Sequence, residues 1–200
     1  MSTSLYRIAV LIDWENIRKN IFEIATKKLG LKVDYNDPDN IKKFIYSFID
    51  SNEDIYRIFL YVSAPLREVS WKGKIIDLSK EKAYQSHVAF LDKISVEELI
   101  AVRKGKLKFR GMLTNNKPDL VQKQVDMLIG LDIAHLSYNK LVDRILILCA
   151  DTDIIPALKT ARINGLQVVV GYCEDLGGLN REIKEHSDFI RKRDFKEIFS

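Results

Sequence analysis

Cysteine is scarce in this sequence, and neither cysteine belongs to a metal-binding pattern. Cys149 and Cys173 lie in or just after apolar runs, with no CxxC or Cys/His spacing around them. Their setting excludes a cysteine-based zinc site and predicts buried, reduced thiols in a cytoplasmic protein. The histidines share no metal-ligand spacing either, and no Ser/His/Asp arrangement can be assembled around them: His87, His135 and His186.

Long apolar runs and glycine-rich phosphate loops are also missing. The first apolar run, residues 5–12, is too short for a membrane-spanning helix and lacks the usual pattern of a signal peptide. Neither a Gly-x-x-x-x-Gly-Lys loop nor a Gly-x-Gly-x-x-Gly turn occurs, so nucleotide binding by such a loop is not supported. No repeat, low-complexity tract or Ser/Gly linker divides the chain. We expect a soluble cytoplasmic protein with no membrane partner and one domain over residues 1–200.

Apolar strands alternate with amphipathic helices along the sequence. Residues 5–12 and 55–64 suit strands buried on both faces. Residues 144–170 are typical of a strand, an Asp-rich turn, a helix ended by Gly165 and a second strand. We expect helices at 17–29, 38–49, 79–92, 95–98 (a capping box), 121–139 and 179–187, a loop at 66–79, an edge strand at 106–112 and a short strand at 189–191. This order predicts a mostly parallel, three-layer α/β fold.

The charge is distributed unevenly although the whole chain carries only +4. Residues 70–123 contain 12 Lys/Arg and 6 Asp/Glu, a net charge of +6, which leaves about −2 for the rest. This segment is either a solvated face or a phosphate-binding surface beside an acidic pocket.

Four aspartates occupy positions that the fold would bring together. Asp13 ends the first strand, Asp151 and Asp153 follow another, and Asp126 lies near the start of the 121–139 helix. These positions meet at the carboxyl edge of a parallel sheet, where Asn16 also lies. Four carboxylates there would repel each other without a cation, and Mg²⁺ prefers oxygen ligands. The arrangement suits phosphodiester hydrolysis, in which one or two metal ions activate water.

Each of these residues also has a purely structural interpretation. Asp153 could be the N-cap of the helix that carries Pro156, and Asn16 could cap the first helix. Asp13 could be a strand-end turn residue, and Asp126 could favour a helix N-terminus electrostatically. The four aspartates are stronger evidence jointly than singly.

Two further residues leave alternatives open. Asp132 falls inside the apolar stripe of the 121–139 helix, where a charge must be paired or hydrogen-bonded. Asp132 lies about 9 Å along the helix axis from Asp126, too far for both to bind one metal ion easily. This distance favours a buried structural role for Asp132, or contact with the metal ligands, over direct metal binding. Trp14, next to Asp13, could stack on a base or fill the core.

Three short motifs together resemble the NYN domain, in the LabA-like branch of the PIN-like nuclease superfamily: Ile12-Asp13-Trp14-Glu15-Asn16, Lys123-Gln124-Val125-Asp126 and Leu148-Cys149-Ala150-Asp151-Thr152-Asp153. The resemblance implies a Rossmann-like PIN-type fold and a ribonuclease that depends on Mg²⁺ or Mn²⁺. It implies that Asp13, Asp126, Asp151 and Asp153 hold metal, that Asn16 orients substrate or a metal-bound water, and that Lys123 lies near phosphate.

This chain departs from the family pattern at Cys149-Ala150, where the family has Ser-Gly, and at Trp14, where a small residue is usual and the entrance could be narrowed. Residues 66–112 match least. The sequence therefore predicts a cytoplasmic ribonuclease that acts on single-stranded or structured RNA, held by the basic segment. A non-catalytic module that binds nucleic acid or protein is the alternative, an Asp-nucleophile phosphotransferase ranks lowest, and a homo-oligomer stays open.

Overall fold

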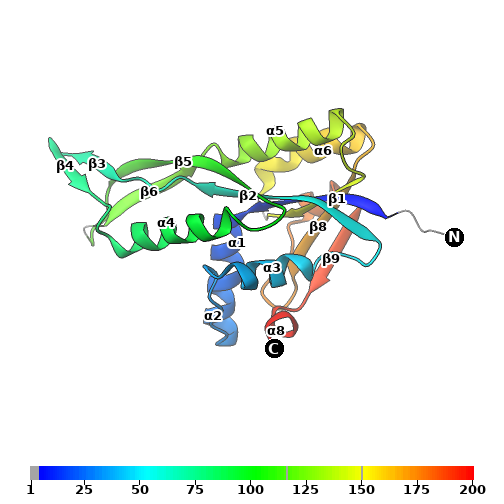
Figure 1. Cartoon of the computed structure of the whole chain (residues 1–200), viewed down its shortest axis with the longest axis horizontal. Helices are drawn as coiled ribbons and strands as arrows, with labels where there is room; N and C mark the ends of the chain where they lie inside the picture. The colour runs from blue at the N-terminus through cyan, green and yellow to red at the C-terminus, as the bar shows by residue number, and fades with distance from the viewer. Residues whose placement is uncertain (1–4, 116, 150) are drawn as a thin grey trace.

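The structure, a computed structural model, describes residues 5–115, 117–149 and 151–200. A seven-stranded sheet runs through its centre in the order β6-β5-β2-β1-β7-β8-β9 (Figure 1). All neighbours are parallel except β5 and β6. The strands are β1 (Tyr6–Asp13), β2 (Glu53–Ser63), β5 (Ile100–Met112), β6 (Pro118–Lys123), β7 (Arg144–Leu148), β8 (Gln167–Cys173) and β9 (Phe189–Arg193).

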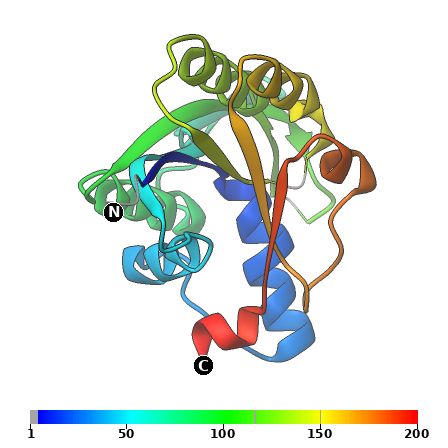
Figure 2. The ribbon, with the colours of Figure 1, turned by 90° about the vertical axis from the view of Figure 1, so that its right-hand side faces the viewer.

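Helices cover both faces of the sheet, which confirms the predicted three-layer α/β fold (Figure 2). One face carries α5 (Val125–Tyr138), α6 (Ile155–Ile163) and α7 (Arg181–Glu185). The other carries α1 (Trp14–Ile17), the π-helical turn Arg18–Phe22, α2 (Glu23–Leu29), α3 (Pro38–Tyr46), α4 (Lys82–Ile94) and α8 (Phe195–Phe199). Among the described residues, no helix has the length and apolar character needed to cross a membrane.

The apolar run of β1 is continuous because both of its faces are buried. Val10 and Ile12 point into the layer that contains α2 and α3, whereas Ala9 and Leu11 point into the layer that contains α5 and α6. Such a strand lies in the middle of a parallel sheet. Asp13 thereby emerges at the carboxyl edge, between β2 and β7.

An arm projects beyond this carboxyl edge and was not expected from the sequence. The pairing of β5 with β2 ends at Gly105, and from Lys106 onward β5 pairs antiparallel with β6. The hairpin of β3 (Glu68–Trp71) and β4 (Lys74–Asp77) packs against it, with the rings of Trp71 and Phe109 5.9 Å apart. We call these four strands, with β5 counted from Lys106, the arm (Figure 1).

Two expectations about this region were wrong, and one was confirmed. Residues 106–112 form the expected edge strand, since they pair with β6 on one side and the pairing with β2 has ended at Gly105. Residues 66–79 form the β3–β4 hairpin rather than a loop. Residues 95–98 do not form a helix, because the chain turns at Leu99 (φ 62°) and enters β5.

The helix expected at 121–139 begins only at Val125. Residues 118–123 pair with β5 instead, and Gln124 separates strand from helix with a left-handed backbone (φ 74°). β6 thus returns the chain to the carboxyl edge, and α5 begins there.

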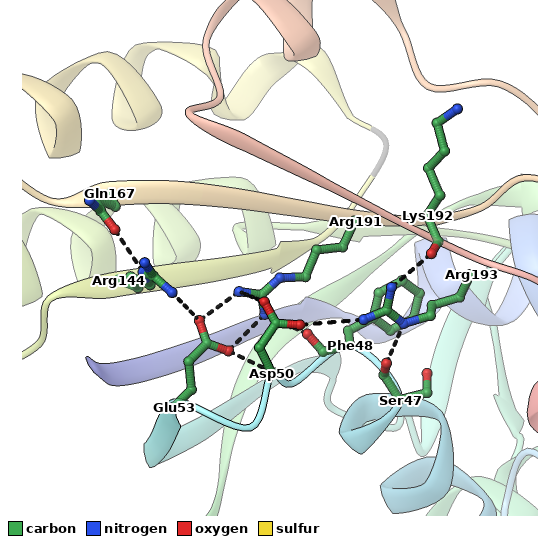
Figure 3. Close-up of polar contacts among 9 residues, drawn as sticks. All are labelled: Ser47, Phe48, Asp50, Glu53, Arg144, Gln167, Arg191, Lys192 and Arg193. Carbon is green, nitrogen blue, oxygen red and sulfur yellow. Dashed lines mark hydrogen bonds and ion pairs between the residues drawn. The ribbon is translucent and has the colours of Figure 1, made fainter. Parts of the chain in front are cut away.

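A cluster of buried ion pairs joins β2, β7 and β9 (Figure 3). The carboxylate of Glu53 is fully buried and accepts hydrogen bonds from the guanidinium groups of Arg144 and Arg191. Asp50 also pairs with Arg191. Burial alone would raise the pKa of Glu53, but the hydrogen bonds from Arg191, from the Asp50 N–H and from Arg144 hold it below its ordinary value.

Candidate metal centre

Three of the four predicted aspartates come together at the carboxyl edge of the sheet. Asp151 lies shortly after β7, Asp153 lies in the 3₁₀ turn Thr152–Ile154, and Asp126 lies in the first turn of α5. One carboxylate oxygen from each lies within 4.8 Å of the other two. The end of a central strand and the N-terminus of a crossover helix thus build one acidic cluster.

Asp13, the fourth aspartate, is not a member of this cluster but lies close to it. The residue is only 4% exposed, and its carboxylate accepts hydrogen bonds from the Asn16 N–H at 3.1 Å and from the Gln122 amide at 3.3 Å. The negative charge of Asp126 acts on Asp13. Asp13 therefore caps α1 and also adds negative charge to the site.

The carboxylates of the site are poorly compensated electrostatically. Burial raises the pKa of Asp13, and two hydrogen bonds oppose this only in part. Burial, followed by the charge of Asp151, raises the pKa of Asp126, while Lys123 lowers it. Burial is the larger cause of both shifts, and the neighbouring carboxylates add to it, so a cation at this place would stabilise the ionised forms.

The donor atoms fit a hard divalent cation. The cluster offers carboxylate oxygens, which are the ligands that Mg²⁺ and Mn²⁺ prefer. Cys149 lies beside the site, but burial raises the pKa of its thiol, so it stays neutral. Its sulfur accepts a hydrogen bond from the Asp151 N–H at 3.3 Å, and it thereby helps to position Asp151. Ala150, the other departure from the family pattern, lies outside the described residues.

The predicted substrate-binding residues have different surroundings. Lys123 is exposed at the end of β6 and acts electrostatically on Asp126. Asn16 is half-buried at the start of α1, where its N–H donates a hydrogen bond to the carboxylate of Asp13. Trp14 is 3% exposed and stacks on Phe90 with a centroid distance of 5.6 Å, so the structure places it in the core rather than where a base could stack.

Two structural alternatives are resolved by the hydrogen bonds. Asp151 caps the 3₁₀ turn, since its carboxylate accepts from the Asp153 N–H at 3.0 Å, so Asp153 is not the N-cap. Asp132 accepts from the Tyr61 hydroxyl at 2.8 Å and from Arg103 at 3.0 Å. Asp132 therefore joins α5 to β2 and β5, and it is not a member of the cluster.

Gln122 is a residue of the site that the sequence did not reveal. Its amide group donates to Asp13, and its carbonyl oxygen accepts from the Ser63 hydroxyl at 3.0 Å. These contacts depend on the pairing of β6 with β5, whereas the sequence placed Gln122 in a helix. Through Gln122 the arm contacts the buried carboxylate of Asp13.

We predict that Gln122→Ala weakens Mn²⁺ binding by about ten-fold without a comparable loss of stability, because Asp13, which adds negative charge beside the metal ligands, loses the donor that orients its carboxylate. Isothermal titration calorimetry with Mn²⁺ and thermal unfolding in EDTA measure the two effects. Ser63→Ala is the companion variant, since it frees the other end of the same amide. Unchanged Mn²⁺ affinity in Gln122→Ala would show that the contact between Gln122 and Asp13 does not contribute to metal binding.

Comparison with known protein families gives a match over nearly the whole chain. The family model of the NYN domain matches residues 7–191, which include all the candidate site residues, and it does not distinguish the LabA-like branch. A search of curated proteins found no significant match. Among solved structures, the nicotinamidase SaPncA from Staphylococcus aureus is similar over 91% of this chain and 89% of its own, with 13% identity and a TM-score of 0.32.

Proposed function

Because this chain belongs to the NYN domain family, in a superfamily of nucleases, we propose that it is a ribonuclease that depends on a divalent metal and hydrolyses RNA phosphodiester bonds. The observation that carries the proposal is the cluster of Asp126, Asp151 and Asp153, whose carboxylate oxygens lie within 4.8 Å of one another. The basic arm beside the cluster supports an anionic polymer as substrate.

In this proposal Asp126, Asp151 and Asp153 hold Mg²⁺ or Mn²⁺. When bound, such an ion supplies Lewis-acid chemistry at the phosphate. Asp13 holds the start of α1, and with it Asn16, against the site. Lys123 binds the phosphate next to the bond that is cleaved. The two cysteines are buried and unpaired, which fits a reducing cytoplasm.

The test combines metal binding with cleavage. We expect the purified protein to bind Mn²⁺ in calorimetry and to cleave end-labelled single-stranded RNA in Mg²⁺ or Mn²⁺ but not in EDTA. Asp126→Asn, prepared identically, controls for contaminating ribonucleases. Metal-independent cleavage, or equal cleavage by Asp126→Asn, would contradict the proposal. A protein that binds RNA but neither binds Mn²⁺ nor cleaves would be a non-catalytic module.

A further inference from the structure

The outward face of α5 is apolar and exposed. Apolar residues lie on all sides of this helix, which contains no lysine, arginine or glutamate. Met127, Leu131 and Tyr138 point away from the sheet and are 60%, 61% and 66% exposed, and Ala134 lies between them on the same side. We call these four residues the α5 stripe. A helix that is apolar on all sides is usually buried on all sides, so the exposed stripe indicates a partner.

The charged residues of α5 lie beside the stripe and not on it. Asp126 belongs to the acidic cluster, and Asp132 accepts from the Tyr61 hydroxyl and from Arg103. The only polar side-chain group on the stripe is the hydroxyl of Tyr138. A partner of this surface is therefore expected to be apolar as well, since it would find no charge to pair with.

The size and position of the stripe suit the centre of a protein interface. In both views α5 and α6 form the outer layer at the top of the molecule (Figure 1, Figure 2). Side chains as large and as exposed as those of the stripe present on the order of 400 Å² of mostly apolar surface. A stable interface buries about 800 Å² on each partner, with an apolar centre and a polar rim. The stripe supplies the centre, and the neighbouring polar residues of α6 supply part of the rim.

The α5 stripe is complementary to itself when two copies lie antiparallel. The intervals between its residues are four, three and four, so the spacing is the same in either chain direction. With a two-fold axis between positions 131 and 134, Leu131 of each copy meets Ala134 of the other, and Met127 meets Tyr138. A large side chain then lies against a small one, and a sulfur lies against an aromatic ring. A parallel pair would place Ala134 against Ala134 and leave a void.

Charge favours the same antiparallel arrangement. Asp126 and the acidic cluster lie at the N-terminal end of the stripe, whereas Lys140 is exposed just beyond its C-terminal end. A parallel pair would bring two acidic clusters together, and they would repel each other. An antiparallel pair separates them by about 20 Å along the helices and places Lys140 of each copy at the level of Asp126 of the other.

We propose that the protein forms a symmetric homodimer in which the α5 stripes of two copies pack antiparallel against each other. Dimers with a two-fold axis are the commonest protein oligomers, and such an axis pairs the same patch on both copies. The inference goes beyond the proposed reaction and does not depend on it. It places the two acidic clusters at opposite ends of the dimer interface.

The first experiment measures the mass in solution by analytical ultracentrifugation in EDTA. We expect twice the chain mass of 23.1 kDa at roughly 50 µM protein. Leu131→Glu should raise the dissociation constant of the dimer by at least about 100-fold, because each dimer would bury two unpaired carboxylates. Leu131 is 61% exposed, so the folded chain should keep its melting temperature.

Val96→Glu is the matched control, since it adds the same charge at an apolar residue that is 81% exposed but lies between α4 and β5. It should leave the dimer unchanged. A dimer that Leu131→Glu does not weaken, or that Val96→Glu weakens equally, would overturn the inference. A monomeric wild type would also overturn it, and the stripe would then serve a different partner.

Cross-linking tests the antiparallel packing on the folded dimer. Met127→Cys and Tyr138→Cys are prepared singly, and a short bismaleimide is added to each and to their equimolar mixture after subunit exchange. We expect cross-linked dimer chiefly in the mixture, because two copies of position 127 would lie about 16 Å apart along the helices. Wild type is the control, since Cys149 and Cys173 are buried. Cross-linking of Met127→Cys alone, as efficient as in the mixture, would overturn the antiparallel packing.

Discussion

Asp151→Asn is expected to reduce RNA cleavage by roughly a thousand-fold, which corresponds to about 4 kcal/mol of lost transition-state stabilisation. Asp151 follows the central strand β7, and its carboxylate lies within 4.8 Å of those of Asp126 and Asp153. The amide of asparagine keeps the shape of the side chain but removes one negative charge from the cluster. Initial rates of cleavage of end-labelled single-stranded RNA at saturating Mn²⁺ measure the loss.

The fold should survive this substitution. Asp151 caps the 3₁₀ turn through the Asp153 N–H, and asparagine is an equally good capping residue. In the wild type Mn²⁺ should raise the melting temperature by mass action, whereas Asp151→Asn should show little shift. Asp92→Asn, an exposed aspartate on α4, is the matched control and should behave as wild type in both assays. Undiminished cleavage by Asp151→Asn would remove Asp151 from the site.

The same variant should also change how stability depends on pH. The pKa of Asp126 is raised by burial and then by the charge of Asp151, so the folded state holds this proton more tightly than the unfolded chain does. In the metal-free protein, the contribution of Asp126 to stability should therefore decline as pH rises from the ordinary pKa of aspartate through the raised one. Asp151→Asn removes part of the repulsion and should flatten this decline, as measured by urea unfolding in EDTA across acidic pH.

The elements that the sequence predicts well are those in which local pattern and tertiary packing agree. The continuous apolar run that ends at Asp13 is buried on both faces in β1, and the run that leads to Asp151 is β7. Strand ends in a parallel sheet lie at one edge, so the cluster of Asp126, Asp151 and Asp153 follows from topology. This is why short motifs located most of the site.

Apart from the strand at residues 106–112, the arm could not be predicted, because its structure depends on pairing between segments that have no strong strand pattern of their own. Residues 121–123 directly precede a helix and carry a similar apolar pattern, and only the partner strand β5 decides that they are extended. The capping box at Ser95 predicts a short helix from local sequence alone. The chain instead turns and enters β5, where Ile100 pairs with Ile58. The role of Gln122 follows from the pairing of β6 with β5.

Trp14 shows a second reason why the sequence did not predict the whole site. Adjacency to Asp13 in the sequence suggested a place at the entrance, but successive residues at the end of a strand point in different directions. Asp13 faces Gln122 and the site, while Trp14 turns into the core against Phe90. Proximity in sequence to a site residue was therefore a poor guide to exposure.

The second large effect concerns stability and lies away from the site. Glu53→Gln is expected to lower the free energy of unfolding by about 3 kcal/mol, because it leaves Arg144 and Arg191 buried without their carboxylate. The side chains of Arg144 and Arg191 are only 10% and 8% exposed, so water cannot replace the lost partner fully. Asp50 still pairs with Arg191, which keeps the loss at the lower end of values for broken buried pairs.

This loss should lower the melting temperature by roughly 6–12 °C for a chain of this size. The control is Glu185→Gln, which breaks the exposed pair with Arg181 on α7 and should cost less than about 0.5 kcal/mol.

The pH dependence of stability gives a second test of the buried cluster. The pKa of Glu53 is held below its ordinary value, so its contribution is present above that value and is lost as pH falls through the lowered pKa. The difference in free energy of unfolding between wild type and Glu53→Gln should therefore shrink as the pH falls. If that difference is small at neutral pH and does not change with pH, the buried cluster does not hold β2, β7 and β9 together.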